Sequence, residues 1–162
     1  MTDTTQPITP VQFVLNEAKL LNEARYTEWL SLFAQDGRYW VPLTGDQQSD
    51  PFSENSLAYE DRILLATRIQ RLHGARAHSL EPGARSVHVL QIPQAQAASL
   101  EGDDWKVYTP FVYIETRGSR QNMLAGTWRH RLRQNASGFE IVLKRVDLLN
   151  APAAHEMIQL FP

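Results

Sequence analysis

The chain has 162 residues, of which 43% are hydrophobic, and its formal net charge is −2. This length fits one ordinary domain, and such a chain can bury roughly 70% of its unfolded surface in a single core. The near-neutral charge gives no general attraction to nucleic acid, and no apolar run approaches the roughly 20 residues of a membrane span. The N-terminus lacks the pattern of a signal peptide, so we expect a soluble, cytoplasmic protein.

The chain contains no cysteine. This excludes disulfides, thiolate catalysis and cysteine-ligated zinc. It also excludes an iron–sulfur cluster held by this chain alone, because even the Rieske type needs two cysteines beside two histidines. The sequence likewise lacks a Gly-rich phosphate loop, a G-x-S-x-G motif and an H-E-x-x-H motif.

Helices are predicted in the first half of the chain, after a loose polar arm over residues 1–8. The first helix begins at a T-P-x-Q capping box, Thr9 to Gln12, and has Val14, Leu15 and Ala18 on its apolar face. The remaining elements of this half are expected in the order helix (25–35, stopped by Asp36–Gly37), strand (38–43), loop (44–56) and helix (57–73, ended by Gly74).

Strands are predicted from about residue 84, where the hydrophobic period changes from helical to pleated. They are expected near residues 85–92, 105–116, 121–134 and 138–149, with a hairpin turn at Asn135–Gly138. Pro42 and Pro110 lie inside strand-like runs and therefore predict edges, bends or bulges. Helices followed by a meander of strands indicate an α+β fold, with helices on one face of an antiparallel sheet and one domain over residues 9–162.

The strand at 121–134 predicts two different faces of the sheet. Its odd positions carry Arg129, Arg131 and Arg133, and its even positions are apolar apart from His130. Side chains alternate across a strand, so one face is basic and the other carries a single histidine. The basic face is expected to be solvated, or to form salt bridges with an acidic partner. Nucleic-acid binding is not favoured, because no aromatic residues interleave with these arginines.

A metal site is one interpretation of His73, His78 and His88, with Glu81 as a further ligand. The H-x4-H spacing argues against it, because a helix places the first two side chains about 140° apart and a strand places them on opposite faces. We favour structural roles, with His73 at the end of a helix and the other two bonded to backbone or partner groups.

A catalytic interpretation exists for His130, because a curved sheet closed by helices can enclose a pocket. Asp36 would be its acid/base partner and Tyr26 would complete the set. A lone histidine on an apolar strand face is more often a core residue, so this remains the alternative reading.

A family resemblance rests on "DGRYWVP" (36–42), "YEDR" (59–62), the block from Arg76 to His88, and "RL" and "KRV" near residues 131 and 144. In these elements the chain resembles the small (beta) subunit of bacterial aromatic-ring-hydroxylating (Rieske non-haem iron) dioxygenases, including the benzoate type. The resemblance runs from about residue 10 to the end. His73 lies outside the pattern, and the final "LFP" replaces a plain apolar run.

The resemblance implies a cone-shaped fold like nuclear transport factor 2 (NTF2-like) or cystatin (cystatin-like), with three helices on a curved, mostly antiparallel sheet. It implies a non-catalytic structural subunit without cofactor, forming a trimer that docks on a large (alpha) subunit, as α3β3. The large subunit would carry the Rieske [2Fe–2S] cluster and mononuclear Fe(II), and would cis-dihydroxylate an aromatic compound with O2 and electrons from NAD(P)H. The predicted subunit interface comprises Tyr39, Trp40, Arg76, His78, Arg85 and His88.

Two alternatives to this function stay open at this point. The same cone fold serves stand-alone isomerases and dehydratases that work without a cofactor, for which His130, Asp36 and Tyr26 would be the catalytic set. A non-enzymatic binding module is the other alternative.

Overall fold

The computed structural model describes residues 7–78, 83–99, 102, 104–151, 158 and 160–162. Seven strands form one sheet in the order β2-β1-β7-β6-β5-β3, and β4 pairs with β5 beside β3. The elements in chain order are α1 (Pro10–Asn22), α2 (Tyr26–Ser31), β1 (Phe33–Pro42), η1 (Gly45–Gln47), β2 (Ser56–Glu60), α3 (Arg62–His78), β3 (Arg85–Leu90), β4 (Gln94–Ala97), β5 (Asp104–Arg117), β6 (Arg120–Asn135) and β7 (Gly138–Leu148).

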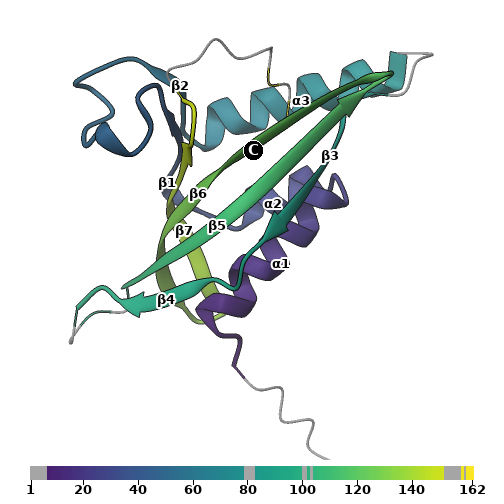
Figure 1. Cartoon of the computed structure of the whole chain (residues 1–162). Helices are drawn as coiled ribbons and strands as arrows, with labels where there is room; N and C mark the ends of the chain where they lie inside the picture. The colour runs from purple at the N-terminus through teal and green to yellow at the C-terminus, as the bar shows by residue number, and fades with distance from the viewer. Residues whose placement is uncertain (1–6, 79–82, 100–101, 103, 152–157, 159) are drawn as a thin grey trace, which may run out of the picture.

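The three helices lie on one side of the sheet, whose long strands β5 and β6 run diagonally across the molecule (Figure 1). Strand β1 runs parallel to β7, and the other strand pairs are antiparallel. The core lies between the helices and the sheet. This is the predicted α+β arrangement of helices on a curved, mostly antiparallel sheet, and that prediction is confirmed.

Helix α1 begins as predicted. The Thr9 side chain accepts a hydrogen bond from the Gln12 N–H, and the Gln12 side chain accepts one from the Thr9 N–H. Its buried face differs from the predicted one, because Leu15 is exposed while Phe13 and Glu17 are buried. The helix therefore brings a carboxylate into the core.

The second predicted helix is shorter than expected. Helix α2 ends at Ser31, and β1 begins at Phe33 instead of residue 38. Asp36 and Gly37 lie within β1 at a break in its register with β7. A Cβ on Gly37 would lie 2.7 Å from the carbonyl oxygen of Ile141, so the glycine allows the two backbones to approach closely. Pairing with β7 thus overrides the turn signal of the Asp–Gly pair.

The third predicted helix is shifted along the chain. Residues 56–60 form the edge strand β2, and the Asp61 side chain accepts a hydrogen bond from the Leu64 N–H at the start of α3. Gly74 lies inside α3, which continues to His78. The prediction that His73 ends the helix was wrong, since it is an exposed residue in the helix interior. Pairing with β1 makes residues 56–60 a strand, so the helix can begin only after residue 61.

The strands of the second half lie close to their predicted ranges, with the additional short strand β4. The break between β3 and β4 lies opposite Pro110. The Pro110 carbonyl accepts a hydrogen bond from the Gln91 N–H, but proline has no N–H to donate in return. None of the described helices is long and apolar enough to cross a membrane. The predicted loose arm over residues 1–8 is described only for its last two residues and stays a prediction.

Candidate functional site

A buried charge cluster lies at the centre of the core. Glu17 on α1 accepts hydrogen bonds from Lys144 Nζ (2.6 Å) and Trp29 Nε1 (2.9 Å) at Oε1, and from His130 Nε2 (2.6 Å) at Oε2. The side chains of Glu17, Lys144 and His130 are all 0% exposed. We call Glu17, His130 and Lys144 the buried charge cluster.

Strand register and helix periodicity assemble this cluster. His130 and Lys144 are directly paired residues of β6 and β7, so their side chains project from the same face of the sheet toward α1. Lys144 Nζ also lies 3.2 Å from the ring centroid of Trp128. A cation held between a carboxylate and an indole face is stabilised despite its burial.

The protonation states follow from burial and from the single negative charge. Burial alone would raise the pKa of Glu17, but Lys144 and His130 hold it below its ordinary value. Burial lowers the pKa of Lys144 to about 8 and lowers the pKa of His130, against the opposing pull of Glu17. One carboxylate balances one ammonium, so the imidazole is neutral and donates its Nε2 proton to Glu17.

Sequence reasoning identified His130 but missed Glu17 and Lys144. Both are charged residues at apolar positions of a regular pattern. Glu17 lies between Val14 and Leu21 on the inner face of α1, and Lys144 shares its strand face with Val146. A charged residue at a core position is the signal that could have found them.

The alternative catalytic set is not brought together by the fold. Asp36 lies on the opposite, outer side and pairs with Arg133 Nη2 at 3.1 Å, which lowers the pKa of its carboxyl. Tyr26 is buried, and its ring packs edge-on against Phe161 with centroids 5.5 Å apart. The carboxylate that meets His130 is therefore Glu17, inside the core.

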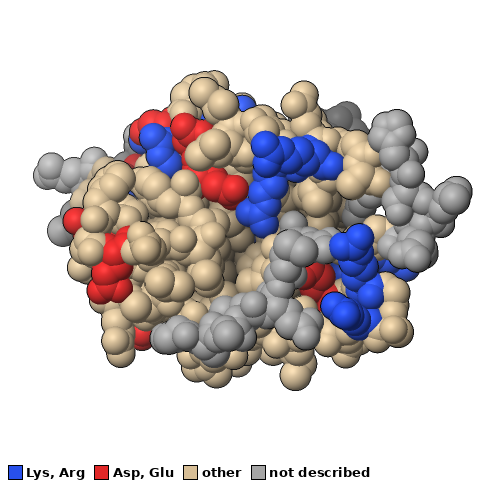
Figure 2. Space-filling model, turned by 90° about the horizontal axis from the view of Figure 1, so that it is seen from above, with Lys and Arg blue, Asp and Glu red and all other residues tan. Residues whose placement is uncertain are grey.

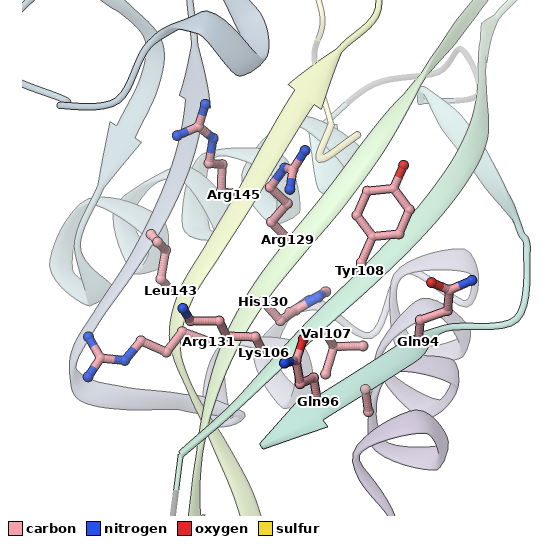
Figure 3. Close-up of a pocket in the computed structure, with 11 residues that line it drawn as sticks. Gln94, Gln96, Lys106, Val107, Tyr108, Arg129, His130, Arg131, Leu143 and Arg145 are labelled. Carbon is pink, nitrogen blue, oxygen red and sulfur yellow. The ribbon is translucent and has the colours of Figure 1, made fainter. Parts of the chain in front are cut away.

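A groove of about 600 Å³ lies on the outer face of the sheet, across β4 to β7 (Figure 3). The three arginines that line it, Arg129, Arg131 and Arg145, already have acidic partners within the chain. Arg131 pairs with Asp104 at 2.8 Å, while Arg129 and Arg145 both pair with Asp147, at 2.9 and 2.7 Å. His130 also borders this groove, but its side chain is 0% exposed.

The predicted stripe of Arg129, Arg131 and Arg133 lies on the outer face of the sheet. Arg133 completes the stripe with a second acidic partner, Glu140, at 3.1 Å. Seen from above, the top of the molecule likewise shows acidic and basic side chains near one another, without a continuous basic band (Figure 2). Intramolecular ion pairs thus replace the predicted acidic partner for these arginines, at least among the side chains that the structure describes.

The predicted interface residues lie in different environments. Tyr39 is buried in the core, and His88 is buried with Nε2 2.9 Å from the Phe161 carbonyl. Burial lowers the pKa of His88 to about 3. Trp40 is buried under Arg145 on the outer face, whereas Arg85 is exposed. Arg76 and His78 belong to α3, and their side chains lie outside the described part of the chain, as does the candidate ligand Glu81.

An apolar patch occupies the outer face of the sheet beside the groove. It consists of two rows of side chains that pair across strands β3, β5 and β6. The first row is Val87, Ile114 and Met123, and the second row is Val89, Val112 and Ala125. Met123 is 69% exposed and Val89 57% exposed. We call these six residues the outer apolar patch. It lies on the opposite side of the sheet from the helices, and apolar patches of this kind mark interaction surfaces.

The described residues contain no group of three or more His, Asp or Glu side chains placed to hold a metal ion. His73 and His88 lie on different elements, α3 and β3, and His88 is engaged by Phe161 and Asn22. Together with the absence of cysteine, this donor set does not fit a Rieske cluster or a facial iron site.

Residues 16–153 match the family described as "Ring hydroxylating beta subunit". The chain belongs to this family. It is 30% identical over 145 residues to the benzene 1,2-dioxygenase beta subunit of Pseudomonas putida, covering 83% of this chain and 77% of that protein. It is 29% identical over 158 residues to the 2-halobenzoate 1,2-dioxygenase small subunit of Burkholderia cepacia, covering 93% and 92%.

Solved structures agree on the fold of this beta subunit. The benzoate 1,2-dioxygenase beta subunit of Burkholderia mallei matches with a TM-score of 0.72 at 23% identity, over 90% of this chain and 94% of that one. An NTF2-like protein with a cystatin-like fold from Novosphingobium aromaticivorans matches with a TM-score of 0.57 at 16% identity, over 86% and 79%. The predicted family, its NTF2-like fold and its role as a subunit of an aromatic-ring dioxygenase are confirmed.

Proposed function

We propose that this beta subunit is a non-catalytic structural component of an aromatic-ring-hydroxylating dioxygenase. The observation that carries this proposal is the closed interior of the cone. Glu17, His130 and Lys144 form an acid/base cluster there, and their side chains have no exposed surface. A group that no substrate can reach holds the core together instead of transferring protons. The alternative of a stand-alone isomerase or dehydratase has no comparable support.

The redox chemistry belongs to the alpha subunit that a beta subunit of this family implies. In our proposal that partner carries the Rieske [2Fe–2S] cluster and the mononuclear Fe(II), and it cis-dihydroxylates an aromatic compound with O2 and electrons from NAD(P)H. This chain's contribution is to fix the position of that partner. The predicted cytoplasmic location stays a prediction.

We place the subunit contacts on the outer apolar patch and the adjoining Arg85, with the chain forming a trimer within an α3β3 assembly. Closed oligomers need a surface that excludes water, and an uncovered sheet face with exposed Val89 and Met123 meets that need. Of the interface residues predicted from the sequence, Tyr39 and His88 would act indirectly, because they are buried and position neighbouring segments.

Co-expression with a Rieske-type alpha subunit tests the proposal. We expect the two chains to co-purify as a complex with three copies of each, measured by size-exclusion chromatography with light scattering. The paired variant Val89→Glu with Met123→Glu should disrupt the assembly while the purified chain keeps its circular dichroism spectrum.

Ile63→Glu is the matched control, because Ile63 is an equally exposed apolar residue (75%) on α3. Assembly should survive this change. Failure of the chain to associate with an alpha subunit would contradict the proposed function. Loss of assembly with Ile63→Glu but not with the patch variant would place the interface on the helices instead.

A further inference from the structure

The ring of Phe161 fills a cage of aromatic side chains inside the cone. It is 1% exposed, and its centroid lies 4.6 Å from that of Trp29, 5.5 Å from Tyr26 and 5.9 Å from Tyr39. The guanidinium carbon of Arg68 lies 4.3 Å from the same centroid. Three aromatic rings and one cation therefore surround a single phenyl group, each in a geometry that favours an aromatic ring at this position.

The backbone beside the ring is held in place independently of it. The Leu160 N–H donates to Glu115 Oε1 at 2.8 Å, and the Leu160 carbonyl accepts from Arg68 Nη2 at 2.7 Å. The Phe161 carbonyl lies 2.9 Å from His88 Nε2. These partners come from α3, β3 and β5, so the segment is positioned like a bound peptide. Its backbone contacts remain available when the phenyl group is removed.

The cage adjoins the buried charge cluster through one shared side chain. Trp29 packs against Phe161 with its ring and donates its indole N–H to Glu17. A molecule in the place of the phenyl group would thus be separated from Glu17 by a single indole. The phenyl group closes this interior site in the intact chain.

We propose that Phe161 is the resident occupant of an aromatic ligand site, which takes an uncharged, single-ring aromatic molecule once the phenyl group is absent. The rings of Tyr39 (85°) and Tyr26 (62°) are inclined steeply to that of Phe161, so the electron-poor edge of one ring meets the electron-rich face of the other. Arg68 adds an attraction to the ring face that a saturated ring of the same size lacks. The site should therefore distinguish toluene from methylcyclohexane.

Phe161→Ala in the full chain tests this inference with toluene and methylcyclohexane as probes. We expect toluene to raise the thermal midpoint of the variant by several degrees, as a ligand that binds only the folded state does. Its dissociation constant, measured by calorimetry, should be at least about fivefold lower than that of methylcyclohexane. Wild-type protein, whose cage is filled, should show no comparable shift.

Phe13→Ala is the matched control. Phe13 is also a buried phenylalanine, and its ring meets Phe139 edge-on at 6.0 Å. Toluene should stabilise this variant far less than Phe161→Ala. Equal stabilisation of the two variants, equal binding of the two probes, or no binding to a folded Phe161→Ala would overturn the proposal.

Folding of the variant is itself a readout. Removing a buried phenylalanine is a large perturbation, so Phe161→Ala can be unfolded at 25 °C. In that case toluene should restore the native circular dichroism spectrum during refolding, and methylcyclohexane should restore less of it. Failure of both probes to restore folding would also overturn the proposal.

Discussion

Replacing Glu17 by glutamine should destabilise the protein far more than a similar change on its surface. The substitution keeps the shape of the side chain but removes the charge that Lys144 Nζ contacts at 2.6 Å. Removing one partner of a buried ion pair costs about 3 to 5 kcal/mol, because the other charge is left without compensation. Lysine can escape by losing its proton, which at pH 7 costs about 4.6 kcal/mol from its ordinary pKa. Whether Lys144 stays charged or loses its proton, the expected loss of unfolding free energy is therefore of the same size.

Urea unfolding at pH 7, followed by tryptophan fluorescence, measures this loss directly, since Trp29 and Trp128 contact the cluster. Glu23→Gln is the control on the same stretch of chain, because Glu23 forms an exposed ion pair with Arg25. Such pairs contribute at most about 1 kcal/mol. The double variant Glu17→Gln with Lys144→Met should regain most of the lost stability, as both charges are then gone.

The pH dependence gives a second signature of the same effect. In Glu17→Gln the folded state holds Lys144 neutral, while the unfolded chain keeps that proton up to its ordinary pKa. Because the unfolded state then binds more protons, stability should rise by about 1.4 kcal/mol per pH unit between about pH 7 and 10. In the wild type the pKa of Lys144 is about 8, so the rise begins only above that pH. A loss no larger than that of Glu23→Gln, or a double variant as unstable as the single one, would refute this reasoning.

Three further predictions concern Lys144 and two glycines. Lys144→Met removes a charge that helps to keep the pKa of His130 low, so the pKa of His130 should rise. Proton NMR of the imidazole measures this pKa, and an unchanged value would show that Lys144 does not influence His130. Gly74→Ala should stabilise by roughly 0.5 to 1 kcal/mol, because an added Cβ there meets nothing within 4 Å in a helix. Gly126→Ala should cost at least about 2 kcal/mol in the same urea assay, because its Cβ would lie 2.1 Å from the Asp147 carbonyl oxygen; equal midpoints for the two variants would show that backbone proximity does not matter.

Local signals were sufficient where the chain interacts with itself over short distances. The Thr9–Gln12 capping box and the Asn135–Gly138 turn occur where they were predicted, since each is closed by residues a few positions apart. The alternation along β6 also placed Trp128 and His130 on one face of the strand, and that face is the buried one. Boundaries that depend on distant partners were missed, as at β1 and β2, where strand pairing decides the conformation.

The sequence by itself determined the class of the protein. Its period change from helical to pleated specified the α+β fold, its motifs identified the beta-subunit family, and its lack of cysteine excluded an iron–sulfur centre in this chain. The tertiary structure alone decided what surrounds His130. Glu17 lies 113 positions away from it and Lys144 lies on the next strand, so only packing of α1 on the β6–β7 pair brings the three side chains together. The same packing places Phe161 against Trp29 and closes the cone, because burial is a property of the assembled layers and not of any one segment.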